Sequence, residues 1–516
     1  PYYNAEVKRK IEGDRCVPEV KEGKTLWSPK EKIDPNEKDQ FIKTGKKQDY
    51  VYDEKFCTIF PRMYSPQDSH VDAYKDWGNV VGTQVSYNTC GEEGIATVPT
   101  FVENLRFFFS YQIGFMYGRY FMWNFSGRQN DMQSYGQVDR GNFITGVPFI
   151  DEILVGPQDN LPPEQADNKG RNVYYMLPLL LGIIGLVWQI NQGKKGMENF
   201  WLTGILFFMT GLAIVLYLNQ TPYQPRERDY AYTGSFYAYA IWIGLGVLGL
   251  ASLLEKVLKN KTISSALATL ACLAVPAQMA SQNWDDHDRS GRYTCRDFGY
   301  NYLVSCAPNA IIFTNGDNDT FPLWYLQEVE GVRRDVRVCN LSYLQTDWYI
   351  DQMRREAYES KPLPITWKRH QYVQGTRDVA YVYNVPEFPR MRVDSAIHDF
   401  VLNEELVKVN EGVAIFPTEN LYLDIDKEHV IKTGTVEARF KDSILPQLEI
   451  KLKNRVLKHE MMILEMLSQN NWNRPMYFAV TVGDEYYMGL KDNFSLEGMA
   501  YRIVPYGIKG AGGNVN

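Results

Sequence analysis

The chain has 516 residues, which is long enough for two or three domains with separate cores. Its formal net charge of −7 lacks the strongly basic balance that nucleic-acid-binding proteins show, so we expect no nucleic acid as a partner. Its seven cysteines form no CxxC pair and no Cys/His cluster, which argues against a zinc site.

Residues 1–100 are rich in Lys, Asp and Pro, and we expect an extracytoplasmic loop region with short strands and helices. In such a compartment Cys57 could pair with Cys90, and Cys295 with Cys306. Free or buried thiols are the alternative, because spacing alone does not establish connectivity.

Residues 101–126 form an aromatic stretch of span length that contains Glu103, Arg106 and Arg119. Each charge inside a bilayer costs about 2.5–3.5 kcal/mol. We therefore predict an amphipathic helix lying at the outer interface. A membrane span whose arginines face a wet cavity is the alternative. Residues 127–172 then form a second extracytoplasmic loop.

Between residues 173 and 280 the chain is strongly apolar, and we predict four transmembrane helices there. They occupy about 173–190, 200–218, 236–254 and 263–280, and the last is rich in Ala and broken by Pro276. Any one of them could be a buried soluble helix, but several in a row with short connectors predict an integral membrane protein.

Lysines mark the connectors after the first and third spans, at Lys194, Lys195, Lys256, Lys259 and Lys261. Short lysine-rich loops stay in the cytoplasm. By alternation, residues before 173, the loop 221–235 and everything after 280 lie outside.

Residues 281–516 have the pattern of a soluble α/β domain. A buried strand is predicted at 310–315, a helix capped by Asp319 and running through Glu330, and a second strand at 336–341. This order predicts a βαβ unit with parallel strands. A helix at 452–468 and a strand at 476–482 follow. The fold class is therefore a multi-pass α-helical membrane protein with extracytoplasmic loops and a C-terminal α/β domain.

The most unusual short segment is the run Arg226, Glu227, Arg228 and Asp229 between the second and third spans. Arginine grips phosphate in a bidentate manner. We expect Arg226 and Arg228 to bind a lipid-linked phosphate and Glu227 and Asp229 to orient them. An internal ion-pair network that ties the loop down is the alternative.

A second candidate is the turn at 314–320, where Asp317, Asn318 and Asp319 could bind a hard cation or sugar hydroxyls at the end of a strand. Turn and cap formation is the alternative. For the polar clusters 284–289 and 128–131 we favour capping and a solvated face. Arg119 and Arg128 are second choices for the phosphate.

Several strings resemble a large family of Bacteroidota membrane proteins, formerly of unknown function and now grouped with the GT-C glycosyltransferases. The resemblance runs from about Phe60 to Tyr506 and is carried by FPRMYSPQDSHVDAYKDW, LRFFFSYQIGFMYGRYFMWNFSGRQND, NQTPYQPRERDYAYTGSFYAYAIWIGLG, FTNGDNDTFPLWYLQEVEGVRRDVRVCNLSYLQTDWYI and NNWNRPMYFAVTV. The family is similar to protein O-mannosyltransferases.

The resemblance implies an enzyme of the bacterial inner membrane with large periplasmic domains. Its partners would be the lipid bilayer, a polyprenyl-phosphate-linked sugar and exported acceptor proteins, whose Ser or Thr hydroxyls receive the sugar. No cofactor is certain, and a divalent cation is an option. A carboxylate would deprotonate the acceptor while arginine stabilises the departing phosphate.

One departure from the family concerns its acidic motif, resembling FWDCGE followed by HPPG, which does not occur here. We expect it upstream of residue 1 and assign no catalytic base. The alternative function is a non-catalytic glycan- or protein-binding component, or a scaffold, of an envelope complex.

Overall fold

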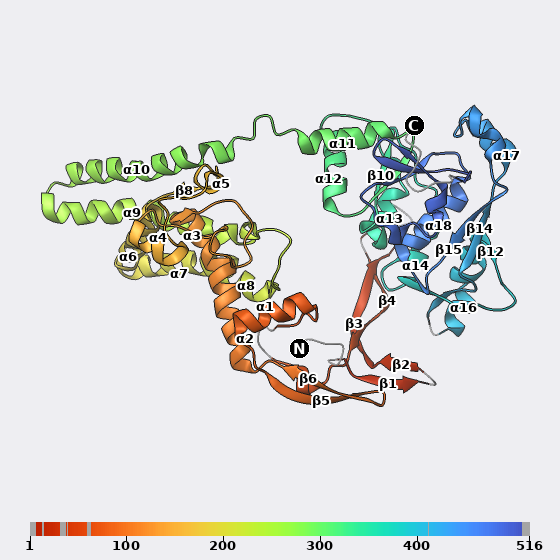
Figure 1. Cartoon of the computed structure of the whole chain (residues 1–516), viewed down its shortest axis with the longest axis horizontal. Coiled ribbons are helices and arrows are strands. Elements are labelled where there is room, and N and C mark those ends of the chain that lie inside the picture. Colours follow the sequence, from red (N-terminus) through yellow and green to blue (C-terminus); the bar gives the residue numbers. More distant parts are fainter. Residues whose placement is uncertain are drawn as a thin grey trace. The chain divides into compact units, whose positions relative to one another are not determined.

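The computed structural model describes residues 7–12, 15–30, 38, 40–58, 63–410 and 412–507, so Phe60–Arg62 at the start of the family resemblance lie outside the described residues. The chain divides into two compact units, which are described separately. The helical unit comprises Pro1–Lys21 and Tyr50–Ser290, and the C-terminal unit comprises Glu22–Asp49 and Gly291–Asn516 (Figure 1).

The helical unit begins with two antiparallel hairpins and two short helices. These are β1 (Arg9–Glu12), β2 (Arg15–Pro18), η2 (Glu54–Phe56), α1 (Asp68–Gly78), β5 (Thr83–Thr89) and β6 (Glu92–Val98). A turn at Cys90 and Gly91, both with positive φ, joins β5 to β6. The predicted loop region therefore contains regular hairpins.

Neither of the two possible cysteine pairs forms, and the alternative of free thiols holds for Cys57, Cys295 and Cys306. Cys90 forms its disulfide with Cys16, and their Cα atoms are 5.9 Å apart. Cys57, Cys295 and Cys306 are free, and Cys306 is buried. Cys16 lies 74 positions before Cys90 in the sequence. A disulfide requires the two Cα atoms to be close in space, and the spacing of cysteines along the chain does not show this.

One continuous helix covers the aromatic stretch, as α2 (Phe101–Phe107), the π-helical η3 (Phe108–Gly118) and α3 (Arg119–Phe125). Thr100 and Glu103 form a capping box at its start. Glu103 also accepts hydrogen bonds from the amides of Val81 and Gly82, and Arg106 donates to the carbonyl of Gly78. These charges are satisfied within the protein. The interfacial position of the helix stays a prediction.

The predicted loop 127–172 contains β7 (Gly127–Arg128), α4 (Pro148–Val155), α5 (Pro163–Ala166) and β8 (Asn172–Val173), with β7 and β8 paired antiparallel. The apolar region that follows comprises α6 (Leu177–Ile190), α7 (Gly193–Thr210), α8 (Leu212–Leu218), η4 (Asp229–Tyr232), α9 (Thr233–Leu258) and α10 (Lys261–His287).

Three helices in the described part of the chain are long and apolar enough to cross a membrane, at Gly193–Leu218, Asp229–Leu258 and Lys261–His287. Helix α6 has only 14 residues, fewer than the predicted first span. Tyr175 and Met176 have left-handed backbone angles, so the helix begins after them. Pro276 lies inside α10 without ending it, and α10 extends past residue 280 to His287.

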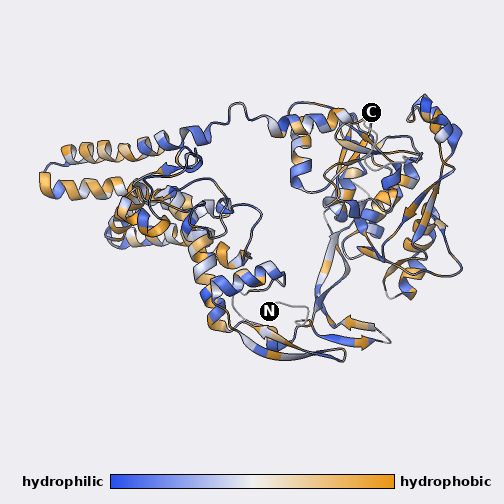
Figure 2. Ribbon diagram, in the orientation of Figure 1, coloured by the Kyte–Doolittle hydropathy of each residue, from blue (hydrophilic) through white to orange (hydrophobic). Residues whose placement is uncertain are grey.

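Glycines bring α6 and α9 into close contact. A Cβ atom at Gly185 would overlap the carbonyl of Trp242, and one at Gly246 would overlap that of Leu181. Such backbone approach through small residues is typical of helices that pack in lipid. Figure 2 shows that α9 and α10 are hydrophobic along most of their length.

The C-terminal unit contains a five-stranded sheet in the order β10-β9-β17-β19-β18. Strands β9 (Ile311–Thr314), β10 (Arg337–Asn340) and β17 (Met476–Ala479) are parallel. Strand β19 (Ala500–Ile503) pairs antiparallel with both β17 and β18 (Phe494–Glu497). The predicted βαβ unit is present, because α12 (Asp317–Glu328) connects β9 to its parallel neighbour β10. Gly316, with φ of 86°, is the N-cap in place of the predicted Asp319.

Two three-stranded sheets accompany it, in the orders β13-β11-β16 and β12-β14-β15. Their strands are β11 (Val379–Val382), β12 (Met391–Arg392), β13 (Ala414–Phe416), β14 (Asn420–Asp424), β15 (Gln447–Lys451) and β16 (Arg455–Leu457). Helix α18 (Lys458–Asn470) begins later than predicted because Arg455–Leu457 pair with β11. Strand β17 ends at Ala479, before the predicted Val482.

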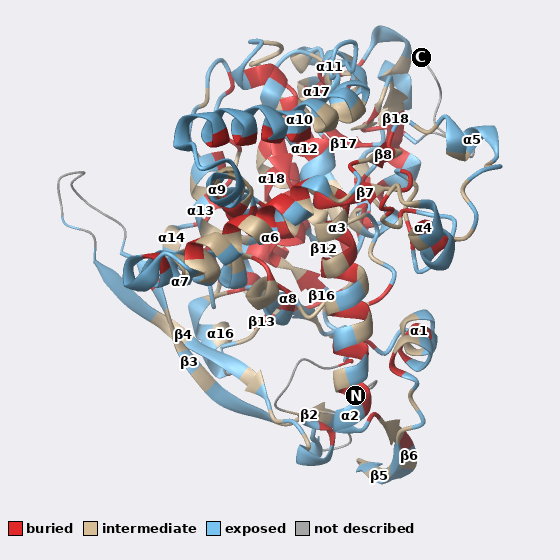
Figure 3. Cartoon of the chain, turned by 90° about the vertical axis from the view of Figure 1, so that its left-hand side faces the viewer, coloured by how far each residue is buried: buried red, intermediate tan, exposed pale blue. Residues whose placement is uncertain are grey.

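The remaining elements of this unit are short, apart from the hairpin strands β3 (Val20–Pro29) and β4 (Phe41–Tyr50) and helix α11 (Thr294–Ser305). They are η5 (Tyr343–Gln345), α13 (Asp347–Met353), α14 (Arg369–Tyr372), α15 (Val393–Ser395), η6 (Ala396–Val401), α16 (Glu404–Val409), α17 (Lys427–Thr433), η7 (Ala438–Ser443), η8 (Asp484–Tyr486) and η9 (Leu490–Asn493). Figure 3 shows α18 buried among them.

Candidate functional site: an arginine-bearing loop of the helical unit

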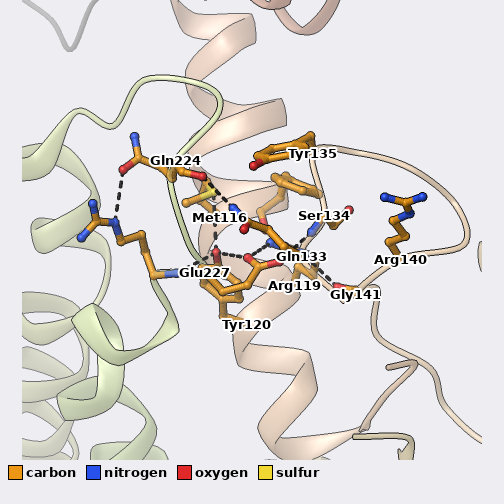
Figure 4. Close-up of polar contacts among 12 residues, drawn as sticks. Met116, Arg119, Tyr120, Gln133, Ser134, Tyr135, Arg140, Gly141, Gln224 and Glu227 are labelled. Carbon is orange, nitrogen blue, oxygen red and sulfur yellow. Dashed lines mark hydrogen bonds and ion pairs between the residues drawn. The ribbon is translucent and has the colours of Figure 1, made fainter. Parts of the chain in front are cut away.

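Glu227 anchors the loop between α8 and α9. Its carboxylate accepts two hydrogen bonds from the Arg119 guanidinium, at 2.7 and 3.2 Å (Figure 4). The Arg119 side chain is only 4% exposed, so the pair lies out of water. Arg119 also donates to the carbonyl of Gly141, at 2.7 Å. The long aromatic helix, the 126–147 loop and the loop at Glu227 are thus joined at one point.

Two further donors saturate the Glu227 carboxylate. The Tyr120 hydroxyl donates to it at 2.5 Å, and the backbone amide of Ser134 donates at 2.9 Å. The same Tyr120 oxygen accepts from the amide of Arg228, at 3.0 Å. The geometry therefore does not favour the expectation that Glu227 orients Arg226 and Arg228. At Glu227 the arrangement follows the alternative of an internal ion-pair network.

Arg226 and Arg228 have no carboxylate partner in the described part of the chain. Arg226 is exposed, and its guanidinium carbon lies 5.4 Å from the centre of the Tyr230 ring. Arg228 donates to the Tyr230 hydroxyl at 2.6 Å and to the Gln224 side chain at 3.2 Å. Both guanidinium groups thus have neutral neighbours, which leaves their charge available to an anion.

Arg128 provides a third guanidinium. It lies 4.1 Å above the Trp123 ring, and its buried Nε has no hydrogen-bond partner among the residues described. Burial lowers the pKa of Arg128, and the carboxylates of Asp229, Asp131, Glu227 and Asp286 oppose this effect. Asp229 therefore acts electrostatically on Arg128.

The polar cluster at 128–131 is less solvated than we expected. Gln129 and Asn130 are buried, and the Asn130 side chain accepts from the amides of Met132 and Gly141. These bonds give the loop that carries Arg128 a fixed shape. In the cluster at 284–289, Asp286 accepts from the side chain of Asn172 at 2.6 Å.

The second candidate, in the C-terminal unit, lies at the carboxyl end of β9 as predicted. Asp317 accepts from the Tyr343 hydroxyl at 3.1 Å, and Asp319 from Thr481 at 2.5 Å. Asn318 makes no side-chain hydrogen bond within the described residues. Internal hydroxyl partners suit a packed turn as well as a ligand site. No group of three or more His, Cys, Asp or Glu residues able to hold a metal ion is found in the described ranges.

Sequence reasoning missed the aromatic and amide partners Trp123, Tyr120, Tyr230 and Gln224. Tyr230 and Gln224 are close in sequence to Arg228, which is a usable signal. Tyr120 and Trp123 are about a hundred residues away, and no sequence pattern joins them to the loop.

The helical unit has three helices long and apolar enough to cross a membrane among the described residues, and it carries the arginine loop. Together with the C-terminal α/β unit, these features indicate a membrane-associated protein. Residues 295–516 match the family described as TMEM260-associated domain 2. Residues 1–109 match a family of unknown function (DUF8416). A stretch of 116 residues, 22% of this chain, is 32% identical to the protein O-mannosyl-transferase TMEM260 of Mus musculus.

That stretch covers 16% of the mouse protein's length. No solved structure matches the chain. The partial similarities relate the chain to glycosyltransferases and support the resemblance noted in the sequence.

Proposed function

We propose that the chain is part of a GT-C-type membrane glycosyltransferase, which transfers a sugar from a polyprenyl-phosphate carrier to Ser or Thr of exported proteins. The similarity to a protein O-mannosyl-transferase supports the reaction class. One observation in the loop carries the site assignment. Glu227 forms an ion pair with Arg119, whereas Arg226 and Arg228 have no carboxylate partner among the described residues.

The carrier phosphate is the proposed ligand of these arginines. Arginine pairs with phosphate through two parallel N–H···O bonds, and the charge on the leaving phosphate grows as the sugar departs. The loop connects the apolar stretch that ends at Leu218 to the one that begins at Asp229. A phosphate attached to a membrane lipid would reach that depth. Arg128 is the third proposed contact.

The proposed orientation of the chain across the membrane follows from the charges at the two ends of the apolar helices. The loop arginines follow α8, whereas Lys194 and Lys195 are at the start of α7. Lys256, Lys259 and Lys261 similarly lie where α9 ends and α10 begins. The lysine ends are proposed to face the cytoplasm of a bacterial inner membrane, and the arginine loop and C-terminal unit the periplasm.

The proposed chemistry is a direct displacement. A carboxylate accepts the proton of the acceptor hydroxyl, the hydroxyl oxygen bonds to the anomeric carbon, and the bond from that carbon to the phosphate oxygen breaks. No residue described here is assigned as that base. The arginines stabilise the phosphate that leaves. Such a monophosphate carries less charge than a diphosphate and requires no metal ion for this role.

The test is a transfer assay in membranes that carry the full-length protein. It compares the wild type with the double variant Arg226→Gln/Arg228→Gln, using labelled polyprenyl-phosphate sugar and an exported acceptor. We expect transfer to fall at least about 100-fold, as loss of transition-state charge stabilisation typically costs. Arg140→Gln is the matched control, because Arg140 is exposed in the same unit and lies outside the hydrogen bonds drawn in Figure 4.

Equal transfer by the wild type and the double variant would refute the role of the two arginines. Absence of transfer by the folded full-length wild type with a range of sugar donors would refute the enzyme proposal. It would favour the alternative of a non-catalytic glycan- or protein-binding component, or a scaffold, of an envelope complex.

A further inference from the structure

The C-terminal unit contains a cavity of about 440 Å³ at the edge of its main sheet. Strand β10, helix α12 and the segment after α13 form its walls. Its lining includes Trp324, Gln327, Arg334, Arg337, Arg355 and Tyr358. The volume lies within the range of small-molecule sites. Arg337 begins β10, so the cavity lies at the opposite end of the parallel strands from the turn at Asp317.

Arg337 is the unusual residue of this cavity. Arg337 is only 6% exposed, and no carboxylate pairs with it in the part of the chain described. One guanidinium nitrogen donates to the carbonyls of Gln352 and Arg355, at 2.7 and 3.1 Å. The other two, Nε and the first terminal nitrogen, have no hydrogen-bond partner among the residues that the structure describes. Two N–H-bearing groups of a buried cation therefore lack an acceptor.

This arrangement is costly without a ligand. A buried charge is tolerated when it is paired and its hydrogen bonds are made, and an unmet donor costs about 1–3 kcal/mol. The carbonyl contacts hold the guanidinium in place but supply no opposite charge. A bound oxyanion would supply both the charge and the missing acceptors.

Two further arginines, Arg334 and Arg355, line the cavity. Arg334 lies 3.9 Å from the centre of the Tyr358 ring, and its buried Nε makes no hydrogen bond although Glu359 lies 3.6 Å away. Arg355 is exposed at the cavity and has no side-chain partner among the residues described. The lining carboxylate of Glu328 accepts from the Tyr358 hydroxyl. The three arginines thus have three carboxylates nearby. Glu328 and Glu356 line the cavity, and Glu359 forms an ion pair with Arg334, so Arg337 is the one of the three that is buried without a carboxylate partner among the described residues.

A fourth cation lies behind the cavity. Arg474 donates to the side chain of Ser360, which lines the cavity, and to several backbone carbonyls. Burial lowers the pKa of Arg474 to about 10, and the positive charge of Arg337 contributes to this shift. The two arginines therefore interact unfavourably, and an anion near Arg337 would relieve that repulsion.

We propose that this cavity binds a sugar-sized ligand through a phosphate or carboxylate group held by Arg337, with Arg334 and Arg355 at the entrance. The Gln327 amide nitrogen donates to the carbonyls of Arg333 and Val336, which leaves its oxygen for a ligand hydroxyl. The rings of Trp324 and Tyr358 form the remainder of the site and suit a hydroxylated ring. The proposal does not depend on the transferase activity or on the loop of the helical unit.

The test is calorimetric titration of the purified chain in detergent with glucose 6-phosphate, glucuronate, inorganic phosphate and neutral glucose. We expect saturable binding of at least one anionic sugar, at least ten-fold tighter than glucose and weakened by salt. Arg337→Gln should weaken that binding at least ten-fold. Comparison of the phosphate and carboxylate sugars identifies which oxyanion the site prefers.

Arg355→Gln is the second variant, because this exposed side chain can change without loss of the fold, and it should weaken binding about three-fold or more. Arg296→Gln is the control, since Arg296 is an exposed arginine of the same unit paired with Glu330. Saturable binding that both cavity variants weaken supports the proposal. Absence of saturable binding of the three anions at millimolar concentration, equal binding of glucose, or unchanged binding in Arg355→Gln and Arg337→Gln would overturn it.

Discussion

The two units differ in how many large hydrophobic side chains their helices expose. In the apolar helices of the helical unit, large hydrophobic residues such as Tyr217, Val257 and Leu270 are exposed. The side of α9 that is buried carries both aromatic and small residues, with glycines at the contact with α6. These residues are Ser235, Phe236, Ala238, Tyr239, Trp242, Gly246 and Gly249. In the C-terminal unit, nearly every residue of α18 is buried, and the three-residue run beginning at Met462 is apolar. Figure 3 shows this contrast between α18 and α10.

The difference indicates which solvent each unit is suited to. Water drives hydrophobic side chains inward, as in the C-terminal unit. Lipid exerts no such force, so helices in lipid associate through small residues and internal polar pairs. The contacts between α6 and α9 and the pair Arg119–Glu227 have this character. The comparison therefore supports a membrane environment for the helical unit.

The buried charges sharpen the contrast. Arg119 in the helical unit has a complete set of partners, including a carboxylate. Arg337 in the C-terminal unit has only backbone carbonyls at one of its three nitrogens. The first arrangement fits a structural role, and the second fits a site that a ligand completes.

The largest expected effect comes from breaking the internal pair. Glu227→Gln removes the counter-charge of buried Arg119, and loss of one partner of a buried ion pair costs about 3–5 kcal/mol. Unfolding of the purified chain in detergent, followed by helical circular dichroism, would measure the change. Glu330→Gln is the control, because its partner Arg296 is exposed, and the expected loss there is below about 1 kcal/mol. Equal losses would show that the Arg119 pair is solvated.

The C-terminal unit should lose stability in acid because of His459. Its ring is buried, and neither nitrogen has a hydrogen-bond partner among the described residues. Burial, aided by the charge of Lys453, lowers the pKa of His459 to about 4. Between pH 6.5 and 4 the unfolded chain then binds more protons than the folded one. Stability should fall by about 3 kcal/mol as pH drops through that window.

Urea unfolding at pH 7.5 and 4.5 would test this, with His459→Phe as the variant. The variant should lose much of the difference between the two pH values. His370→Gln, at an exposed histidine of the same unit, should retain it. A pH dependence unchanged in His459→Phe would assign the acid sensitivity to other groups.

Sequence patterns predicted what depends on neighbours in the chain. The apolar helices and the unit β9–α12–β10 follow from runs and turns of local sequence, and both are present. The boundaries differ where distant pairing intervenes, as at β16, or where backbone angles are unusual, as at Met176. Local composition does not carry that information.

The candidate site was predictable only in part. The charges of the loop at Arg226 stand out in the sequence, but the partner of Glu227 lies 108 residues away on another helix. The disulfide of Cys16 and the position of Arg337 in the wall of a cavity depend on tertiary structure in the same way. In the sequence, Arg337 is one residue of a predicted strand. Nothing in the pattern indicates that two of its guanidinium nitrogens have no hydrogen-bond acceptor among the described residues.

A smaller effect should come from enlarging a glycine between α6 and α9. Gly246→Leu would force the two backbones apart, and such overpacking costs about 1–3 kcal/mol. Gly244→Leu is the matched control on the same helix, since nothing lies within 4 Å of a Cβ atom there. Unfolding in detergent would compare the two. Similar stability of both variants would contradict the close approach of α6 and α9.

The smallest change in stability is expected at the arginine loop itself. Arg226 is exposed and has no carboxylate partner in the described residues, so Arg226→Gln should alter the free energy of unfolding by no more than about 0.5 kcal/mol. Its neighbour Glu227 should show several times that effect, measured by the same unfolding experiment. If Arg226→Gln instead destabilised the chain as much as Glu227→Gln, Arg226 would be a structural residue, and a loss of transfer in its variants would no longer indicate phosphate binding. A normal unfolding curve combined with lost transfer separates the two roles within one loop, because folding then depends on the carboxylate and ligand binding on the arginines beside it.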